Sequence, residues 1–200
     1  MDITRYELNF PASNGGHDIF GCVWRDADCK HYRAVVQLVH GMAEYILRYE
    51  DFAVYLARRG YVVVGNDHAG HGFSVGSEKE RGYFGKRDNS WQYLIDDMNY
   101  LEGVMRLEFP DIPYFMLGHS MGSFVSRQYL IQYGSKIDGA ILMGTGDPGK
   151  LKVAFGLAVA GFTRVLRGDF YRSDLINYLM LDSNDHYFFE KECTSWLSSN

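Results

Sequence analysis

Between residues 34 and 144, short apolar runs alternate with longer amphipathic stretches, and this alternation limits the possible folds most strongly. The runs are AVVQLV, YVVVGN, YFMLG and GAILMG. Nearly continuous apolar runs of this length are typical of parallel strands that are covered on both faces. The stretches between them, at residues 48–59, 91–109 and 121–133, have the periodicity of helices. Strands and helices in alternation predict an open α/β sheet.

Two more strands are predicted before the first of these runs. In RYELNF, Tyr6, Leu8 and Phe10 alternate with polar residues, as in a half-buried strand. DIFGCVW follows after the turn signal PASNGG. The chain is therefore expected to open with an antiparallel hairpin. The expected fold class is α/β, with a mostly parallel central sheet flanked by helices.

From residue 147 onward the alternation stops, so we divide the chain into a core at residues 1–146 and a helical cap region at residues 147–200. The segment LKVAFGLAVAGFTRVLRG predicts a helix that is apolar nearly all round. A cap over the sheet is the favoured interpretation, and an ordinary core helix is the alternative. The uncharged run 153–163 is shorter than the roughly 20 residues that cross a bilayer. It is suited to transient contact with a membrane or micelle surface.

The charge pattern excludes one class of partner. The 200 residues carry a formal net charge of −5 with both signs interspersed, so no basic stripe is available for a nucleic acid.

The start MDITRYELNF lacks the basic and then apolar segments of a secretory signal. Cys22, Cys29 and Cys193 show no CxxC spacing and are expected to be free thiols. We therefore expect a cytoplasmic protein.

The sequence GHSMG, residues 118–122, matches the pattern G-x-S-x-G and lies between a predicted strand and a predicted helix. That context is what a nucleophilic serine on a sharp strand-to-helix turn requires. Gly118 and Gly122 remove the side chains that would collide where strand and helix approach, which leaves the Ser120 hydroxyl exposed at the carboxyl edge of the sheet. Ser120 is the predicted catalytic nucleophile.

A second motif, HGM, ends the strand AVVQLV. In this arrangement the loop after that strand donates one backbone N–H to the oxyanion hole, and the residue after the nucleophile donates the other. These positions are Met42 and Met121. His40 is interpreted as a hydrogen-bonded anchor of the loop rather than as a catalytic residue.

The segments HGMAEYILRYEDFA, DHAGHGFSVG and GHSMGS resemble the monoacylglycerol lipase and lysophospholipase branch of the α/β-hydrolases, a branch with a hydrolase domain of the serine aminopeptidase S33 type. The resemblance runs in register over residues 34–146. It implies a serine hydrolase without cofactor or metal that cleaves the ester of a single acyl chain, with a helical cap shaping an acyl pocket. It also implies that Asp67, His68, Gly70 and His71 belong to a loop that braces the site.

The resemblance places the catalytic aspartate and histidine after later strands of the sheet, so we expect both beyond Asn200 and expect residues 1–200 to be the N-terminal portion of a longer hydrolase. An in-chain triad of Ser120, Asp147 and His186 has the right order. However, SNDHYFF is typical of a polar turn, so Asp147 and His186 are not assigned to the site. A sheet that stops at GAILMG also leaves an apolar edge unpaired.

Other functions remain open at this stage. The chain could be a catalytically inactive α/β-hydrolase-like protein that binds an acylated ligand, or a general short-chain carboxylesterase. Proline-specific aminopeptidases share the serine motif, but their glycine-rich oxyanion loop differs from HGMAE. Metal-dependent chemistry ranks lower, because His68 and His71 lack a recognised set of further ligands nearby.

Overall fold

The computed structural model describes residues 2–85, 90–147, 149–171 and 173. The chain divides into two compact units, residues 1–145 and 146–200. The first unit opens with β1 (Ile3–Phe10) and β2 (Ile19–Asp26), which pair antiparallel from Ile3 opposite Asp26 to Phe10 opposite Ile19. This is the hairpin that the alternating pattern predicts.

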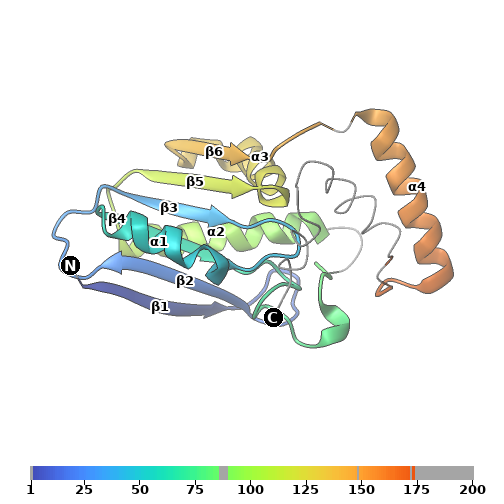
Figure 1. Cartoon of the computed structure of the whole chain (residues 1–200), viewed down its shortest axis with the longest axis horizontal. Coiled ribbons are helices and arrows are strands. Elements are labelled where there is room, and N and C mark those ends of the chain that lie inside the picture. The colour runs from blue at the N-terminus through green and yellow to red at the C-terminus, as the bar shows by residue number, and fades with distance from the viewer. Residues whose placement is uncertain (1, 86–89, 148, 172, 174–200) are drawn as a thin grey trace, which may run out of the picture. The chain divides into compact units, whose positions relative to one another are not determined.

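The apolar runs form the remaining strands of one six-stranded sheet, in the order β1-β2-β4-β3-β5-β6 (Figure 1). Their bounds are β3 (Ala34–Val39), β4 (Tyr61–Asn66), β5 (Tyr114–His119) and β6 (Gly139–Met143). β3 pairs parallel with β4 and with β5, and β5 pairs parallel with β6. β2 joins β4 antiparallel, so the sheet is mostly parallel, as expected.

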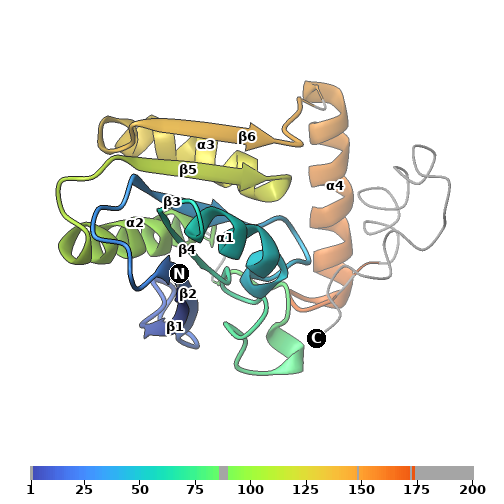
Figure 2. The same cartoon turned by 60° about the vertical axis from the view of Figure 1, so that its left-hand side comes forward.

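Helices cover both faces of this sheet, as Figure 1 and the turned view in Figure 2 both show. α1 (Glu50–Ala57) follows the short 3₁₀ helix η1 (Ile46–Tyr49) and packs on one face. α2 (Ser90–Glu108) and α3 (Met121–Tyr133) pack on the other. The short 3₁₀ helices η2 (Glu78–Glu80) and η3 (Gly134–Lys136) lie in connections. The predicted helices are confirmed, with ends that shift by one or two residues.

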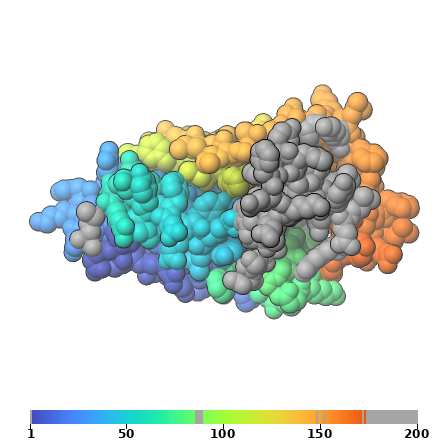
Figure 3. Space-filling model, in the orientation of Figure 1, coloured from blue at the N-terminus to red at the C-terminus, as the bar shows by residue number. Residues whose placement is uncertain are grey.

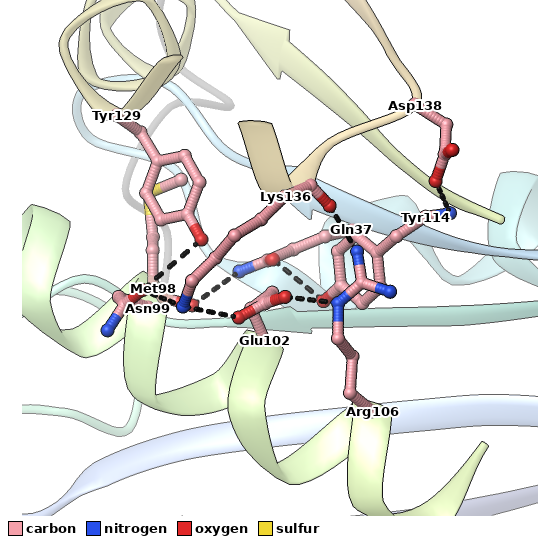
Figure 4. A network of polar contacts seen from close by, with 9 residues as sticks. All are labelled: Gln37, Met98, Asn99, Glu102, Arg106, Tyr114, Tyr129, Lys136 and Asp138. Carbon is pink, nitrogen blue, oxygen red and sulfur yellow. Dashed lines mark hydrogen bonds and ion pairs between the residues drawn. The ribbon is translucent and has the colours of Figure 1, made fainter. Parts of the chain in front are cut away.

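A buried polar network joins α2 to the sheet and to η3 (Figure 4). Arg106 and Lys136 approach the buried carboxylate of Glu102 from either side, and Lys136 lies 3.2 Å from it. In the middle of the sheet, the Tyr114 hydroxyl donates to Gln37 at 2.8 Å. Glu102, Arg106 and Lys136 also line a cavity of about 460 Å³ near the amino end of β6. Ser120 lies at the other, carboxyl end of the strands. The network satisfies buried polar groups that would otherwise destabilise the fold.

The edge of the sheet at β6 is apolar and exposed on the face that α1 covers elsewhere. Phe115 is 37% exposed, Ile141 58% and Met143 49%. Figure 3 shows β5 and β6, in yellow to orange, reaching the surface above α1. Within the described residues, β6 pairs only with β5. The structure therefore has the open apolar edge that the sequence predicts.

In the second unit, α4 (Lys150–Arg167) is the predicted helix of the cap region. Several of its large apolar side chains are more than 60% exposed: Leu151, Phe155, Leu157, Phe162, Val165 and Leu166. The part of the predicted cap after residue 173, including His186 and Cys193, lies outside the described residues. The function of this region as a cap stays a prediction.

Candidate active site

Ser120 lies at the sharp turn between β5 and α3. Its backbone has φ 52° and ψ −120°, a conformation that costs a residue other than glycine about 1–3 kcal/mol. The Ser120 N–H donates a 2.9 Å hydrogen bond to the carbonyl of Met143 in β6, and the Ser120 carbonyl accepts one from the Ser123 hydroxyl at 2.6 Å. The surrounding structure therefore holds the serine in the strained turn that the G-x-S-x-G motif predicts.

Two glycines make this turn sterically possible. A Cβ atom added to Gly118 would lie 2.5 Å from Ser126 Oγ, and one added to Gly122 would lie 2.1 Å from the backbone oxygen of Val39. Both separations are far inside van der Waals contact. Any side chain at Gly122 would have to displace the end of β3, so the spacing of the motif has a direct steric cause.

The loop after β3 passes beside the nucleophile. A Cβ atom on Gly41 would lie 3.2 Å from Ser120 Cβ. Among the described residues, no hydrogen bond is donated by the backbone N–H of Met42 or by that of Met121, the first residue of α3. Unused N–H groups next to a nucleophile are what an oxyanion hole requires. The assignment of Met42 and Met121 to that function stays a prediction.

A buried carboxylate connects this loop to the serine turn. Glu44 is 4% exposed, and its Oε2 accepts the Gly41 N–H and the Tyr49 hydroxyl, each at 2.7 Å. His119 Nδ1 lies 3.4 Å from both Glu44 oxygens and 3.2 Å from the Tyr49 hydroxyl, and Arg48 Nε lies 3.8 Å from the carboxylate. The hydrogen bond to Glu44 raises the pKa of His119. Burial opposes ionisation of Glu44, but its hydrogen bonds outweigh burial and lower its pKa.

Local sequence patterns predict no role for Glu44, Tyr49 or His119. One signal was available, because Glu44 is the acidic residue in the otherwise uncharged segment HGMAEY. A charge in a loop next to a predicted nucleophile is a candidate for a buried, hydrogen-bonded group. Its partners could not be identified, because Tyr49 and His119 reach it only through the folded sheet.

His40 is an anchor of the loop, as predicted. Its Nε2 accepts the His68 N–H at 3.0 Å, so Nδ1 carries the proton and donates to the Gly41 carbonyl at 2.7 Å. His68 donates through Nε2 to the His40 carbonyl at 3.1 Å. Burial, and then the nearby His68 and His71, lower the pKa of His40 well below its ordinary value.

Within the described part of the chain, no cluster of His, Cys, Asp and Glu side chains is arranged to bind a metal ion.

Asp67 is buried at the end of β4 and braces two loops. Its Oδ1 accepts the Ile46 N–H at 2.6 Å, and its Oδ2 accepts the Phe73 N–H at 2.7 Å. Burial raises the pKa of Asp67 to about 6, although both backbone hydrogen bonds oppose that shift. A Cβ atom on Gly72 would lie 2.0 Å from Oδ2, so the loop closes tightly on the carboxylate. These contacts support the structural role that was predicted for this loop.

The buried histidines make acid destabilisation an expected property. Burial lowers the pKa of His68 to about 3, and that of His40 also falls far below 6.5. Below pH 6.5 the unfolded chain takes up protons at these residues and the folded chain does not, so stability falls as the pH falls. From pH 7 to pH 5 the loss is about 2 kcal/mol per histidine. Asp67 and His119 shift in the opposite direction and offset part of it.

Because burial also lowers the pKa of His71, the expected net loss of unfolding free energy is about 2 kcal/mol or more between pH 7 and pH 5. Urea unfolding of the intact protein at pH 7, 6 and 5 measures it. His68→Gln should flatten the dependence on pH, because it removes a histidine whose pKa burial lowers. Stability that is constant or rises toward pH 5 would show that the buried histidines take up protons in the folded protein.

The in-chain triad gains no support from the described residues. Asp147 is exposed, and its Oδ1 accepts the N–H of Gly149 at 2.9 Å, which is a local turn contact. His186 lies outside the described residues. The structure thus brings together Ser120 and the loop of Met42, and the positions of the acid and the base stay a prediction.

Comparison with known proteins agrees with this geometry. The profile of the family described as serine aminopeptidase, S33, matches residues 30–173. A monoacylglycerol lipase of Mycolicibacterium smegmatis is 35% identical over 142 residues, which are 70% of this chain and 47% of that protein. A monoglyceride lipase of Rattus norvegicus is 28% identical over 143 residues, which are 72% of this chain and 44% of that protein.

A solved structure is similar over almost all of the chain. The carboxyl esterase of Bacillus coagulans superposes with a TM-score of 0.79 at 27% identity, covering 94% of this chain and 59% of that chain. The present chain spans about half the length of the curated relatives that it matches. The match of the family profile and the shared architecture lead to one assignment: the chain belongs to the serine aminopeptidase S33 family of α/β-hydrolases.

Proposed function

We propose that this protein is a serine hydrolase of carboxylic esters that works through an acyl-enzyme on Ser120. The observation that carries the proposal is the strained Ser120 turn with the Gly41 loop beside it. In that geometry the loop after β3 lies beside Ser120, and the backbone N–H groups of Met42 and Met121 donate no hydrogen bond among the described residues. The names of the similar lipases and of the similar esterase support the same reaction class.

In this mechanism, Ser120 Oγ attacks the ester carbonyl while a histidine removes its proton. The carbonyl oxygen becomes negatively charged and accepts hydrogen bonds from the N–H groups of Met42 and Met121. The alcohol leaves with the proton from the histidine, and water then releases the acid by the reverse sequence. We propose that this histidine and the aspartate that orients it are supplied by sequence beyond residue 200.

The proposed substrates are esters of single acyl chains, of the monoacylglycerol or lysophospholipid type. Two observations support this class: the similar proteins are named as lipases of one acyl chain, and α4 presents many exposed apolar side chains. A general short-chain carboxylesterase is the first alternative, supported by the esterase structure. An inactive protein that binds an acylated ligand is the second.

We also propose that α4 contacts a lipid surface. Its sequence KLKVAFGLAVAGFTRVLR contains basic residues and no acidic residue, although the whole chain has a net charge of −5. A helix with basic residues, no acidic residue and many exposed apolar side chains is suited to lie in the membrane interface. Among the described helices, none meets the criteria for a segment that spans the bilayer.

Phe155→Asp is expected to weaken both properties of α4, because it places a charge among exposed apolar side chains. Sedimentation with vesicles that contain phosphatidylglycerol should decrease, and kcat/KM for long acyl esters should decrease about tenfold. In the wild type, each additional buried methylene should raise kcat/KM by up to about fourfold, because it contributes about 0.8 kcal/mol. Leu107→Asp on α2, where the leucine is 87% exposed, is the matched control.

The outcomes separate the alternatives. A preference for acetyl esters that is unaffected by Phe155→Asp would favour the short-chain carboxylesterase. Binding of a fatty acyl ligand without turnover would favour the inactive binding protein. Equal sedimentation of wild type and Phe155→Asp would contradict the contact between α4 and a lipid surface.

A further inference from the structure

Glu44 occupies the position where three parts of the site meet. It follows the oxyanion loop in sequence, accepts the Gly41 N–H at 2.7 Å, and lies 3.4 Å from the imidazole of His119. Gly41 in turn lies beside Ser120, since a Cβ atom there would be 3.2 Å from Ser120 Cβ. One buried carboxylate therefore links the backbone of the loop to the residue that precedes the nucleophile.

We propose that Glu44 is a positioning residue of the active site, which fixes the loop backbone at Gly41, one peptide before the Met42 N–H, against Ser120, and that His119 is the partner that balances its charge. This inference rests on the proposed ester hydrolysis for its effect on rate. Catalysis depends on N–H groups that are already aimed at the oxyanion position, and displacement by about 1 Å can cost on the order of 100-fold. The Gly41 N–H belongs to the peptide before the one that carries the Met42 N–H. Its hydrogen bond to Glu44 therefore fixes one side of Gly41, while the Gly41 carbonyl on the other side accepts a hydrogen bond from the His40 ring at 2.7 Å.

The charge of Glu44 must be balanced, because an uncompensated carboxylate near an oxyanion hole would disfavour the negative charge of the intermediate. The groups that face it are Arg48 and Tyr49 from η1, His119 from β5, and, from the loop after β4, His68 and His71. Burial lowers the pKa of His68 and of His71, so both are neutral at pH 7. Arg48 thus supplies positive charge, and His119, whose pKa the hydrogen bond to Glu44 raises, adds to it when it takes up a proton.

Two substitutions in the intact protein separate the hydrogen bond from the charge. Glu44→Gln keeps an oxygen that can accept the Gly41 N–H, so kcat should stay within about fivefold of wild type. Glu44→Ala removes the acceptor, so kcat should fall about 30- to 100-fold while KM changes less than threefold. Asp51→Ala, which removes an exposed carboxylate of the first turn of α1, should have no effect on either constant.

A second readout does not depend on turnover. In NMR titrations of the wild type, the Gly41 amide signal should shift with the same midpoint as the His119 ring, and that midpoint should lie above 6.5. In Glu44→Gln the His119 midpoint should fall and the Gly41 signal should no longer follow it. If the wild type hydrolyses no ester, the proposed function fails. The titration still shows whether Glu44 links the Gly41 N–H to His119.

Two results would overturn the inference. One is a wild-type kcat in folded Glu44→Ala, and the other is a Gly41 amide that is unaffected by His119 titration in the wild type. If Glu44→Ala does not fold, Glu44→Gln and the titration give the decision. A large fall of kcat in Glu44→Gln that equals the fall in Glu44→Ala would show that the charge, and not the Gly41 hydrogen bond, is what matters.

Discussion

Ser120→Ala is expected to reduce ester hydrolysis by the intact protein on the order of 10⁴-fold or more, as the loss of a triad nucleophile does. The substitution removes only the hydroxyl, because alanine retains the Cβ and the same φ of 52°. The contacts that hold the turn, to Met143 and from Ser123, use the Ser120 backbone and remain. Initial rates with a monoacylglycerol and with a p-nitrophenyl ester measure the effect.

Ser126→Ala is the matched control, because it also removes one serine hydroxyl. Ser126 lies in α3, and its hydroxyl is buried without a hydrogen-bond partner among the described residues. Its activity should stay within a few fold of wild type. Thermal unfolding of both variants should show that each is folded. Activity of Ser120→Ala close to wild type would end the serine hydrolase account.

Extension of the chain past residue 200 is expected to have the second large effect. Without a histidine near Ser120 the hydroxyl has no general base, and loss of the base from a triad costs on the order of 10⁴- to 10⁶-fold. Additional strands would also pair with β6 and cover Phe115, Ile141 and Met143. Residues 1–200 alone should therefore aggregate or react slowly with a fluorophosphonate, and the longer protein should be soluble and reactive.

Both properties should appear together, because the same added strands carry the base and cover the edge. The added sequence should contain a strand that ends in aspartate and, later, a histidine in a loop after another apolar strand. A soluble and rapidly labelled protein of residues 1–200, whose labelling is lost on His186→Ala, would instead establish the triad with Asp147 and His186.

The regular elements of the core were predictable from the sequence because each has a strong local signal. The alternation in RYELNF gives β1, the apolar runs give β3 to β6, and the GHSMG pattern gives the turn at Ser120. These signals depend on neighbours within a few residues. The steric clashes at Gly118 and Gly122 explain why the pattern identifies the turn so reliably.

Contacts between distant segments were not predictable in the same way. The network of Glu44, Tyr49 and His119 joins residues up to 75 positions apart. The link between Glu102 and Lys136 joins α2 to η3 across the fold. Buried charges of this kind have no periodicity in the sequence, because their partners are set by packing rather than by local pattern.

Fluorophosphonate labelling of the intact, extended protein, mapped by mass spectrometry of its peptides, tests the central claim most directly. The account predicts one label per chain, on Ser120, together with loss of ester hydrolysis in proportion to labelling. A protein that hydrolyses esters while Ser120 stays unlabelled, or that carries its label on another residue, would contradict it.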